Sequence, residues 1–219
     1  MIRLALQRGR HAALRLAEMA TDARLGIVTM TPDADIASYP DPEARNARYE
    51  PLNYPSLNQI AARIAAGPDD VIYDIGCGMG RVVCYFARRA VKKVVGVDLD
   101  AGLLRICEEN LARLRDRKSP VELRNGDAAE GDYSDATAVI LFNPFGAEVL
   151  RLVLAKLQVT VQTTGRPIRV FYSFPAHQNV FAEFPAFRQT DAFNVLYRTG
   201  RMTTLVFTAS RFAQEPATN

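Results

Sequence analysis

The sequence predicts an α/β fold in which a mostly parallel sheet lies between two layers of helices, a three-layer sandwich. Two observations predict it. From Asp70 onward, short apolar runs that are typical of buried strands alternate with helical stretches, and this alternation is typical of a parallel sheet. Near the C-terminus, two β-rich runs are joined by Thr199-Gly200-Arg201, which predicts a hairpin and one antiparallel strand beside the parallel ones.

The residues before this alternation predict a helical extension. The stretch MIRLALQRGRHAALRLAEMA is amphipathic and predicts a surface helix, with Ala13, Leu16, Ala17 and Ala20 on one apolar stripe. Its arginines are also typical of an organelle transit peptide. The acid at Glu18 and the absence of serine favour the surface helix.

A second helix is expected after an irregular, proline-rich segment. Ser56 is its expected cap and Gly67 its expected stop. We therefore divide the chain into an N-terminal helical and lid segment, a sheet domain and a flexible polar tail. These parts span residues 1–66, 67–213 and 214–219.

The elements of the sheet domain follow from the same pattern. The expected strands are Val71–Asp74, Val94–Asp98, Val121–Arg124, Ala138–Phe142 and Ile168–Ser173. The expected helices are Gly80–Ala90, Ala101–Arg115 and Ala147–Leu157, with a short piece after Asp127. The two runs of the hairpin are Phe187–Arg198 and Met202–Ser210. Ligands of such sheets bind outside the carboxyl ends of the strands, so the residues that follow each strand are the candidates for a site.

Composition excludes several classes of protein. No apolar run has the length that a membrane-spanning helix needs, so no membrane partner is expected. The three cysteines lack metal-ligand spacing and predict reduced thiols in a cytoplasmic protein. The two histidines, His11 and His177, lie far apart, and no metal site is expected. The net charge of +3 does not indicate a nucleic-acid partner, although it leaves one open.

The loop Gly76-Cys77-Gly78-Met79-Gly80 follows the first expected strand and brings backbone amides close to a ligand. A triphosphate loop ends in Gly-Lys-Ser or Gly-Lys-Thr, which Gly80-Arg81-Val82 does not match. A dinucleotide loop is one residue longer. The carboxylate of Asp74, ahead of the glycines, would repel a pyrophosphate, whereas it suits a cation such as an amino-acid ammonium.

Two further carboxylates follow later strands. Asp98 lies about twenty residues beyond the loop, where a carboxylate accepts hydrogen bonds from both ribose hydroxyls of an adenosine ligand. Asp127 lies after the third strand, where it can accept from the adenine amino group. Each has an alternative role as a helix cap. Asp98 therefore favours an adenosine ligand without choosing between NAD and S-adenosylmethionine.

The segments YDIGCGMGRV, VVGVDLD, NGDAAE and LFNPFG occur in the order and spacing of the class I S-adenosylmethionine-dependent methyltransferases. The chain resembles this family from about residue 49 to residue 173, most specifically in the first two segments. It is most similar to a bacterial branch with NARYEPLNYPSLNQI before the glycine motif. The resemblance implies a Rossmann-like sandwich with a seven-stranded sheet and one antiparallel strand, S-adenosylmethionine as cofactor and no metal.

The resemblance also implies a set of cofactor contacts. Asp74 and the glycines would surround the methionine part of the cofactor, Asp98 would bind its ribose and Asp127 its adenine. The complete expected set is Tyr54, Asp74, Gly76, Cys77, Gly78, Gly80, Asp98, Leu99, Asp127, Ala128 and Asn143.

The stretch Asn143-Pro144-Phe145 leaves the fourth expected strand, where the activated methyl group should lie, and is the candidate catalytic site. The Asn143 oxygen can hold the N–H or O–H of an acceptor, and an aromatic ring can stack on a planar acceptor or face a cation. The alternative role for Asn143 is that of a turn residue. Relatives that methylate amides and amines carry two prolines here, whereas this chain has one. The acceptor therefore stays open: a protein side chain, an RNA or a small molecule.

Further aromatic residues are candidates for the walls of the site. Tyr49, Pro51 and Tyr54 can form a lid, or simply pack the N-terminal segment against the sheet. Tyr172 and Phe174 can line the acceptor pocket. Arg81 is expected to cap or pair at the surface. Two other functions compete with methyl transfer: a nicotinamide-dependent oxidoreductase, and a non-catalytic protein that only binds S-adenosylmethionine.

Overall fold

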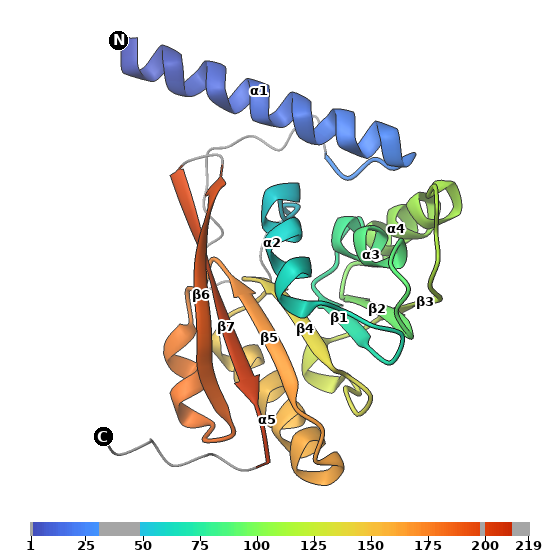
Figure 1. The fold of residues 1–219 in the computed structure, drawn as a ribbon, viewed down its shortest axis with the longest axis vertical. Coiled ribbons are helices and arrows are strands. Elements are labelled where there is room, and N and C mark those ends of the chain that lie inside the picture. The colour runs from blue at the N-terminus through green and yellow to red at the C-terminus, as the bar shows by residue number, and fades with distance from the viewer. Residues whose placement is uncertain (1, 31–48, 198–199, 212–219) are drawn as a thin grey trace.

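The computed structural model describes residues 2–30, 49–197 and 200–211, with residues 2–11 described as helix backbone only. The predicted tail 214–219 lies outside the described residues. Seven strands form one sheet in the order β3-β2-β1-β4-β5-β7-β6 (Figure 1). Their bounds are β1 Val71–Ile75, β2 Lys93–Asp98, β3 Val121–Asn125, β4 Ala138–Phe142, β5 Ile168–Ser173, β6 Phe187–Tyr197 and β7 Gly200–Ala209.

The predicted sheet is confirmed. β1 to β5 pair in parallel, while β7 pairs antiparallel with both β5 and β6 and is the one antiparallel strand. Every residue of β1 is buried, which is why the central strands appear in the sequence as continuous apolar runs. The strand order reverses between β1 and β4, so the carboxyl ends of these strands diverge and leave room for a ligand.

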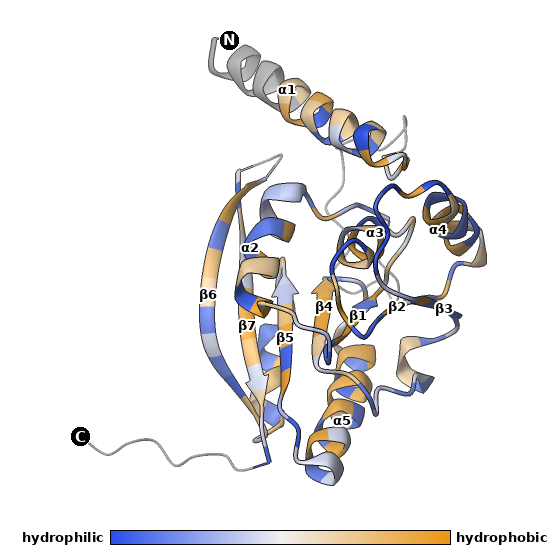
Figure 2. Ribbon diagram, turned by 45° about the vertical axis from the view of Figure 1, so that its right-hand side comes forward, coloured by the Kyte–Doolittle hydropathy of each residue, from blue (hydrophilic) through white to orange (hydrophobic). Residues whose placement is uncertain are grey.

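Helices cover both faces of the sheet. One face carries α2 (Tyr54–Ile64), α3 (Arg81–Ala87) and α4 (Ala101–Arg113). The other carries α5 (Ala147–Thr164) and two short 3₁₀ helices, η1 (Ala128–Glu130) and η2 (Gln178–Glu183). The residues of β4 and α5 are largely apolar, as their orange ribbons show (Figure 2). Among the described residues, no helix has both the length and the apolar character needed to cross a membrane.

The start of α2 differs from the prediction. Its cap is Asn53, whose side-chain oxygen accepts a hydrogen bond from the Ser56 backbone N–H at 3.0 Å. Asparagine is as good a cap as serine, and Pro55 fits the first helical turn, where its missing N–H costs nothing. The helix also stops earlier, at the left-handed Ala65 instead of at Gly67.

A further difference is the way α1 (Ile2–Leu25) packs. Its predicted apolar stripe is exposed, and Leu16 keeps 65% of its surface. Among the side chains of α1 from residue 12 onward, those of Asp22 and Leu25 are buried. Leu25 shares one hydrophobic core with Ile60 of α2 and Ile72 of β1. Residues from the segment before position 66 contribute to the core of the sheet. The division of the chain at residue 66 stays a prediction.

Candidate functional site

A cavity of about 360 Å³ opens at the carboxyl edge of the sheet, where the strand order reverses. The glycine loop, the ends of β2 and β4, the starts of α4 and η1, and residues 49 and 50 surround it. The candidate residues that line it are Gly76, Asp98, Leu99, Asp127, Ala128, Pro144 and Phe145. The candidates Tyr54, Asp74, Cys77, Gly78, Gly80 and Asn143 lie outside that lining.

The glycine loop is shaped by close contacts that other residues cannot make. Gly76 and Gly78 have φ angles of +84° and +52°, in the left-handed region that favours glycine. A Cβ at Gly76 would lie 2.5 Å from Cβ of Pro144. A Cβ at Gly78 would lie 2.1 Å from the Tyr49 ring. The loop therefore touches β4's exit on one side and an aromatic ring on the other.

Asp98 at the end of β2 holds this loop in place. Its Oδ2 accepts a hydrogen bond from the Gly78 backbone N–H at 2.7 Å, and its Oδ1 accepts from the Asp100 N–H at 2.9 Å. The alternative role of Asp98 as the cap of α4 is wrong. Asp100 is that cap, and its Oδ1 accepts from the N–H groups of Gly102 and Leu103. Asp98 is thus left to line the cavity.

Asp127 has the cap role that the sequence allowed, and its contact with adenine stays a prediction. Its Oδ1 accepts from the Ala129 N–H at 2.9 Å and caps η1, and the residue also lines the cavity. The loop that carries it is tied to β2, because the Asn125 side-chain amide donates to the backbone oxygens of Asp98 and Leu99. Two adjacent strand ends therefore present carboxylates to one cavity.

Asp74 lies beneath the glycine loop and is 4% exposed. Its Oδ2 is buried and has no hydrogen-bond partner in the described part of the chain. Burial, followed by the nearby charge of Asp98, raises the pKa of this carboxyl well above its usual range. A buried acceptor without a donor is costly, and a cationic or N–H group of a ligand would satisfy it.

Asn143 stands at the exit of β4 with a φ angle of +40° and is 4% exposed. Its Oδ1 accepts a hydrogen bond from the Tyr172 hydroxyl at 2.9 Å, and that hydroxyl accepts from the His177 backbone N–H at 3.2 Å. These two hydrogen bonds fix the orientation of the Asn143 amide, because the Tyr172 hydroxyl has one proton to donate and Asn143 Oδ1 accepts it. The neighbours Phe142 and Pro144 line the cavity.

Tyr49 and Glu50 reach the cavity from the segment before α2. The Tyr49 hydroxyl donates to the Thr29 backbone oxygen at 2.8 Å, which holds its ring against the glycine loop. Burial raises the pKa of this hydroxyl, so it stays protonated as a donor. Of the lid candidates, Tyr49 lines the cavity, whereas Tyr54 does not. Among the described residues, no three potential metal ligands lie close enough together to hold a metal ion.

Comparison with known proteins gives the family of the central region. The family model described as a methyltransferase domain matches residues 72–164. These residues carry the glycine loop, Asp98, Asp127 and the exit of β4. They form a class I methyltransferase domain.

Individual relatives match this domain over short stretches. One is the probable ribosomal RNA small subunit methyltransferase A of Methanosarcina mazei, which is 32% identical over 41% of this chain and 31% of its own length. Another is a protein-lysine N-methyltransferase of Saccharolobus islandicus, which is 38% identical over 34% of this chain and 46% of its own. The chain therefore spans less than half the length of each relative.

Solved structures share the fold of the domain. An RNA methyltransferase from Salinibacter ruber, in complex with S-adenosyl-L-homocysteine, has a TM-score of 0.56 and 23% identity. The match covers 78% of this chain and 100% of that chain. The m1A22 tRNA methyltransferase of B. subtilis has a TM-score of 0.56 and 16% identity, over 73% of this chain and 67% of its own.

A buried ion cluster joins the methyltransferase domain to α1. Arg81, the first residue of α3, is 2% exposed, so its expected place at the surface is wrong. Its guanidinium pairs with Glu18 and, at 3.2 Å, with Asp22. It also donates to the Thr29 hydroxyl at 2.7 Å. A buried arginine needs such partners, and α1 supplies both carboxylates.

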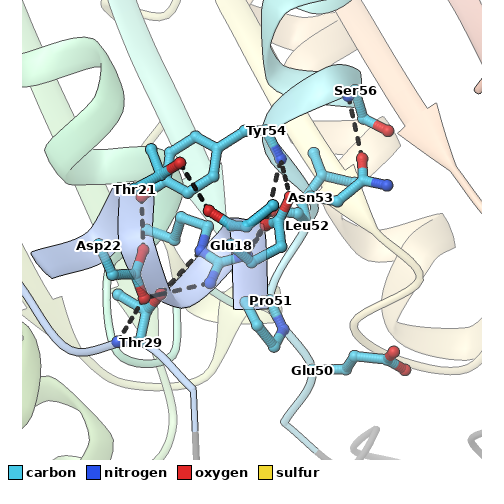
Figure 3. Close-up of polar contacts among 12 residues, drawn as sticks. Glu18, Thr21, Asp22, Thr29, Glu50, Pro51, Leu52, Asn53, Tyr54 and Ser56 are labelled. Carbon is cyan, nitrogen blue, oxygen red and sulfur yellow. Dashed lines mark hydrogen bonds and ion pairs between the residues drawn. The ribbon is translucent and has the colours of Figure 1, made fainter. Parts of the chain in front are cut away.

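The first residue of α2 is tied into the same cluster (Figure 3). The Tyr54 backbone N–H donates to the Glu18 carboxylate at 3.2 and 3.3 Å, and the Tyr54 hydroxyl donates to Asp22. Burial, followed by the hydrogen bond to Asp22, raises the pKa of the Tyr54 hydroxyl. Tyr54 thus packs α1 against the domain, which was the alternative to a lid role.

Several residues of the cavity lining were missed from the sequence, and Asp100, Phe142 and Glu50 are the polar and aromatic side chains among them. Asp100 caps α4 and lies two residues after Asp98 in the stretch Asp98-Leu99-Asp100. Its place directly before the expected helix at Ala101 was the signal that could have identified it. Phe142 is the last residue of β4 and was assigned only to the strand. Glu50 had no signal, because its segment has no periodic pattern and its place depends on tertiary contacts.

Proposed function

We propose that this chain transfers the methyl group of S-adenosylmethionine to an acceptor. The observation that carries the proposal is the acidic cavity at the switch point of the sheet. Among the described residues that line it, four are acidic and none is basic. This balance suits a cofactor with a sulfonium and an ammonium group, and it disfavours a ligand with a pyrophosphate.

The residues present fit that cofactor. Asp98 and Asp127 follow adjacent strands, and their carboxylates are the groups that would accept hydrogen bonds from the ribose and from the adenine amino group. Asp74 has a buried oxygen that lacks a donor, next to the glycine loop, and would accept from the ammonium. S-adenosylmethionine supplies an electrophilic methyl group, and the protein's task is to position the acceptor and exclude water.

The exit of β4 is the proposed place of the acceptor. Pro144 and Phe145 line the cavity, and Asn143 fixes the turn between them and Phe142. Among the matched relatives, one acts on ribosomal RNA and one on protein lysine by name. The proposal therefore includes methyl transfer without naming the acceptor. A cytoplasmic location also remains a prediction, based on three cysteines that are all free.

Calorimetry of the purified protein with S-adenosylmethionine, S-adenosylhomocysteine and NAD tests the proposal. The two adenosyl ligands should bind and raise the melting temperature, because a ligand that binds only the folded state stabilises it. NAD should do neither. Binding of NAD without a response to S-adenosylhomocysteine would favour the oxidoreductase. Binding of S-adenosylmethionine without methyl transfer to any fraction of a cell lysate would favour the non-catalytic protein.

A further inference from the structure

Glu50 is the acidic residue of the cavity that lies farthest along the chain from the strand ends that would hold the nucleoside. It comes from the segment between α1 and α2, while Asp98, Asp100 and Asp127 follow β2 and β3. Tyr49, its neighbour in the chain, lies against the glycine loop. Phe142, at the end of β4, lines the same cavity. Tyr197 contacts both Glu50 and Phe142, so Glu50 lies near the exit of β4, which is the proposed place of the acceptor.

The carboxylate of Glu50 is held in place by the hairpin. The Tyr197 hydroxyl at the end of β6 donates to Glu50 Oε1 at 2.7 Å and approaches the Pro51 backbone oxygen at 3.3 Å. The Tyr197 ring meets the Phe142 ring edge-on, with 5.8 Å between centroids. One residue earlier in β6, the Leu196 backbone oxygen accepts from the Asn53 side-chain amide at 2.9 Å. The segment 50–53 is thus fixed to the hairpin at both ends.

An anchored carboxylate beside aromatic rings is a receptor for an ammonium group. The carboxylate accepts N–H donors and complements the positive charge, and the faces of aromatic rings attract cations and their methylated forms. Here Tyr49 and Phe142 line the cavity together with Glu50. The arrangement differs from the nucleoside side, where the carboxylates are the ends of strands and the neighbouring lining residues Val97 and Leu99 are aliphatic.

We propose that the methyl acceptor is a basic aliphatic amine of the lysine type, and that Glu50 binds its nitrogen. This inference rests on the proposed function. The ammonium first releases one proton to solvent. The lone pair of the neutral amine then forms the N–C bond while the C–S bond breaks, and the electron pair of that bond stays on sulfur. The methylated amine leaves as an ammonium ion or releases a proton to solvent. Glu50 binds and orients the nitrogen before transfer.

The charge at the cavity favours an amine over an RNA acceptor. A protein that binds RNA gathers basic side chains where the phosphates lie, since these contacts supply most of the affinity. Among the described residues that line this cavity, four carry carboxylates and none carries a positive charge. A phosphate backbone beside the methyl group would face this field, whereas a lysine side chain is attracted by it.

The experiment compares methyl transfer to three defined polymers. Purified protein and S-adenosylmethionine with a tritiated methyl group are incubated with poly-L-lysine, with fully acetylated poly-L-lysine or with total RNA. Label should appear on poly-L-lysine and on neither of the others. Glu50→Gln, which keeps the size of the side chain, should raise the KM for poly-L-lysine at least tenfold. Glu108→Gln, an exposed site on α4 outside the cavity, is the matched control and should leave it unchanged.

Cofactor affinity separates this inference from the proposed function. In Glu50→Gln, the Kd for S-adenosylmethionine should stay within about threefold of the wild type, a free-energy difference below about 1 kcal/mol. A large loss of cofactor affinity with an unchanged KM would overturn the inference, because Glu50 would then serve the cofactor. Transfer to RNA in place of poly-L-lysine, or to neither polymer, would also overturn it. If S-adenosylmethionine does not bind at all, the proposed function itself fails.

Discussion

Two groups of acidic side chains flank the glycine loop, and they have opposite surroundings. On the side of α1, Glu18 and Asp22 are paired with the buried guanidinium of Arg81. On the side of the cavity, Asp98 and Asp127 accept backbone N–H groups and face an opening that has no basic lining residue among those described. The first group is neutralised by the chain itself. The second group collects negative charge at an opening.

The difference predicts which carboxylates stabilise the fold and which serve the proposed ligand. A buried ion pair with complete hydrogen bonds is costly to break, because removing one partner leaves the other charge buried. Asp74 marks the opposite case, with a buried oxygen that lacks a donor in the described part of the chain. Unsatisfied groups of this kind are rare in proteins and are concentrated at functional sites. Substitutions on the two sides should therefore affect different properties.

The largest effect is expected from Arg81→Met. This change keeps most of the apolar volume but removes the guanidinium that pairs with the buried Asp22 and with Glu18, so the free energy of unfolding should fall by about 3–5 kcal/mol. Urea unfolding followed by circular dichroism measures it. Arg88→Met, at the C-terminal cap of α3, is the matched control, because the pair of Arg88 with Asp116 is exposed at 34% and 73%. It should cost less than about 1 kcal/mol. Equal losses would mean that the Arg81 cluster contributes no more than a surface pair.

The second effect concerns the cavity side and should appear in binding. Asp98→Ala removes the proposed ribose acceptor and the partner of the Gly78 N–H, so the affinity for S-adenosylmethionine should fall by about 2–4 kcal/mol. Calorimetry measures the loss. Asp100→Ala is the control: it removes the cap of α4, so unfolding should become easier by about 1 kcal/mol with a smaller change in affinity. If both variants lose stability alone, Asp98 has no role in binding.

The third effect tests the contact that separates the two sides. Gly78→Ala places a methyl group against the Tyr49 ring at a positive φ angle, and should cost about 2–3 kcal/mol of stability. Gly165→Ala has a positive φ angle of +71° and nothing within 4 Å of the added carbon, so it should cost only the strain of about 1 kcal/mol. In a Tyr49→Ala background the extra cost of Gly78→Ala should disappear. Its persistence there would mean that the strain is in the backbone.

The fold and the cavity side could be predicted because their signals are local. β1 is buried along its whole length and therefore appears as an unbroken apolar run, and Asp98 is located by its place at the end of the next such run. The hairpin was visible because β6 and β7 are adjacent in the chain. The cap of α2 was missed because Asn53 and Ser56 are both good caps, and only the tertiary contact of Asn53 with Leu196 distinguishes them.

The α1 side could not be predicted, because its signals are long-range and polar. Arg81 pairs with Asp22 and Glu18, which lie 59 and 63 residues away along the chain, and no pattern in the sequence links the three residues. The apolar stripe of α1 suggested that its alanines and Leu16 mark the packed face. The energy of satisfying a buried guanidinium decides instead that the face with Glu18 and Asp22 turns inward. Hydrophobic periodicity carries no information about such a choice.

The smallest expected effect, and the sharpest contrast between the two sides, is the pH dependence of Asp74. Burial and the charge of Asp98 raise the pKa of Asp74 in the folded protein above the ordinary value of about 3.9, so the folded state holds this proton more tightly than the unfolded state. The contribution to stability is complete below that ordinary value and is lost as pH rises through the folded pKa. Asp74→Asn should therefore match the wild type near pH 4 and exceed it by about 1 kcal/mol at neutral pH without ligand.

The same substitution should act in the opposite direction on binding. An ionised Asp74 attracts the ammonium of S-adenosylmethionine, so wild-type affinity should rise with pH through the folded pKa of Asp74, and in Asp74→Asn this rise should be absent. Asp132 is a control of opposite sign, because the hydrogen bond from the Ser134 backbone N–H lowers the pKa of the Asp132 carboxyl. The contribution of Asp132 to the free energy of unfolding is therefore present at neutral pH and lost on acidification. Urea unfolding and calorimetry from pH 4 to pH 8 measure both. A less stable Asp74→Asn at neutral pH would show that Asp74 is satisfied without a ligand and belongs with the Arg81 side of the comparison.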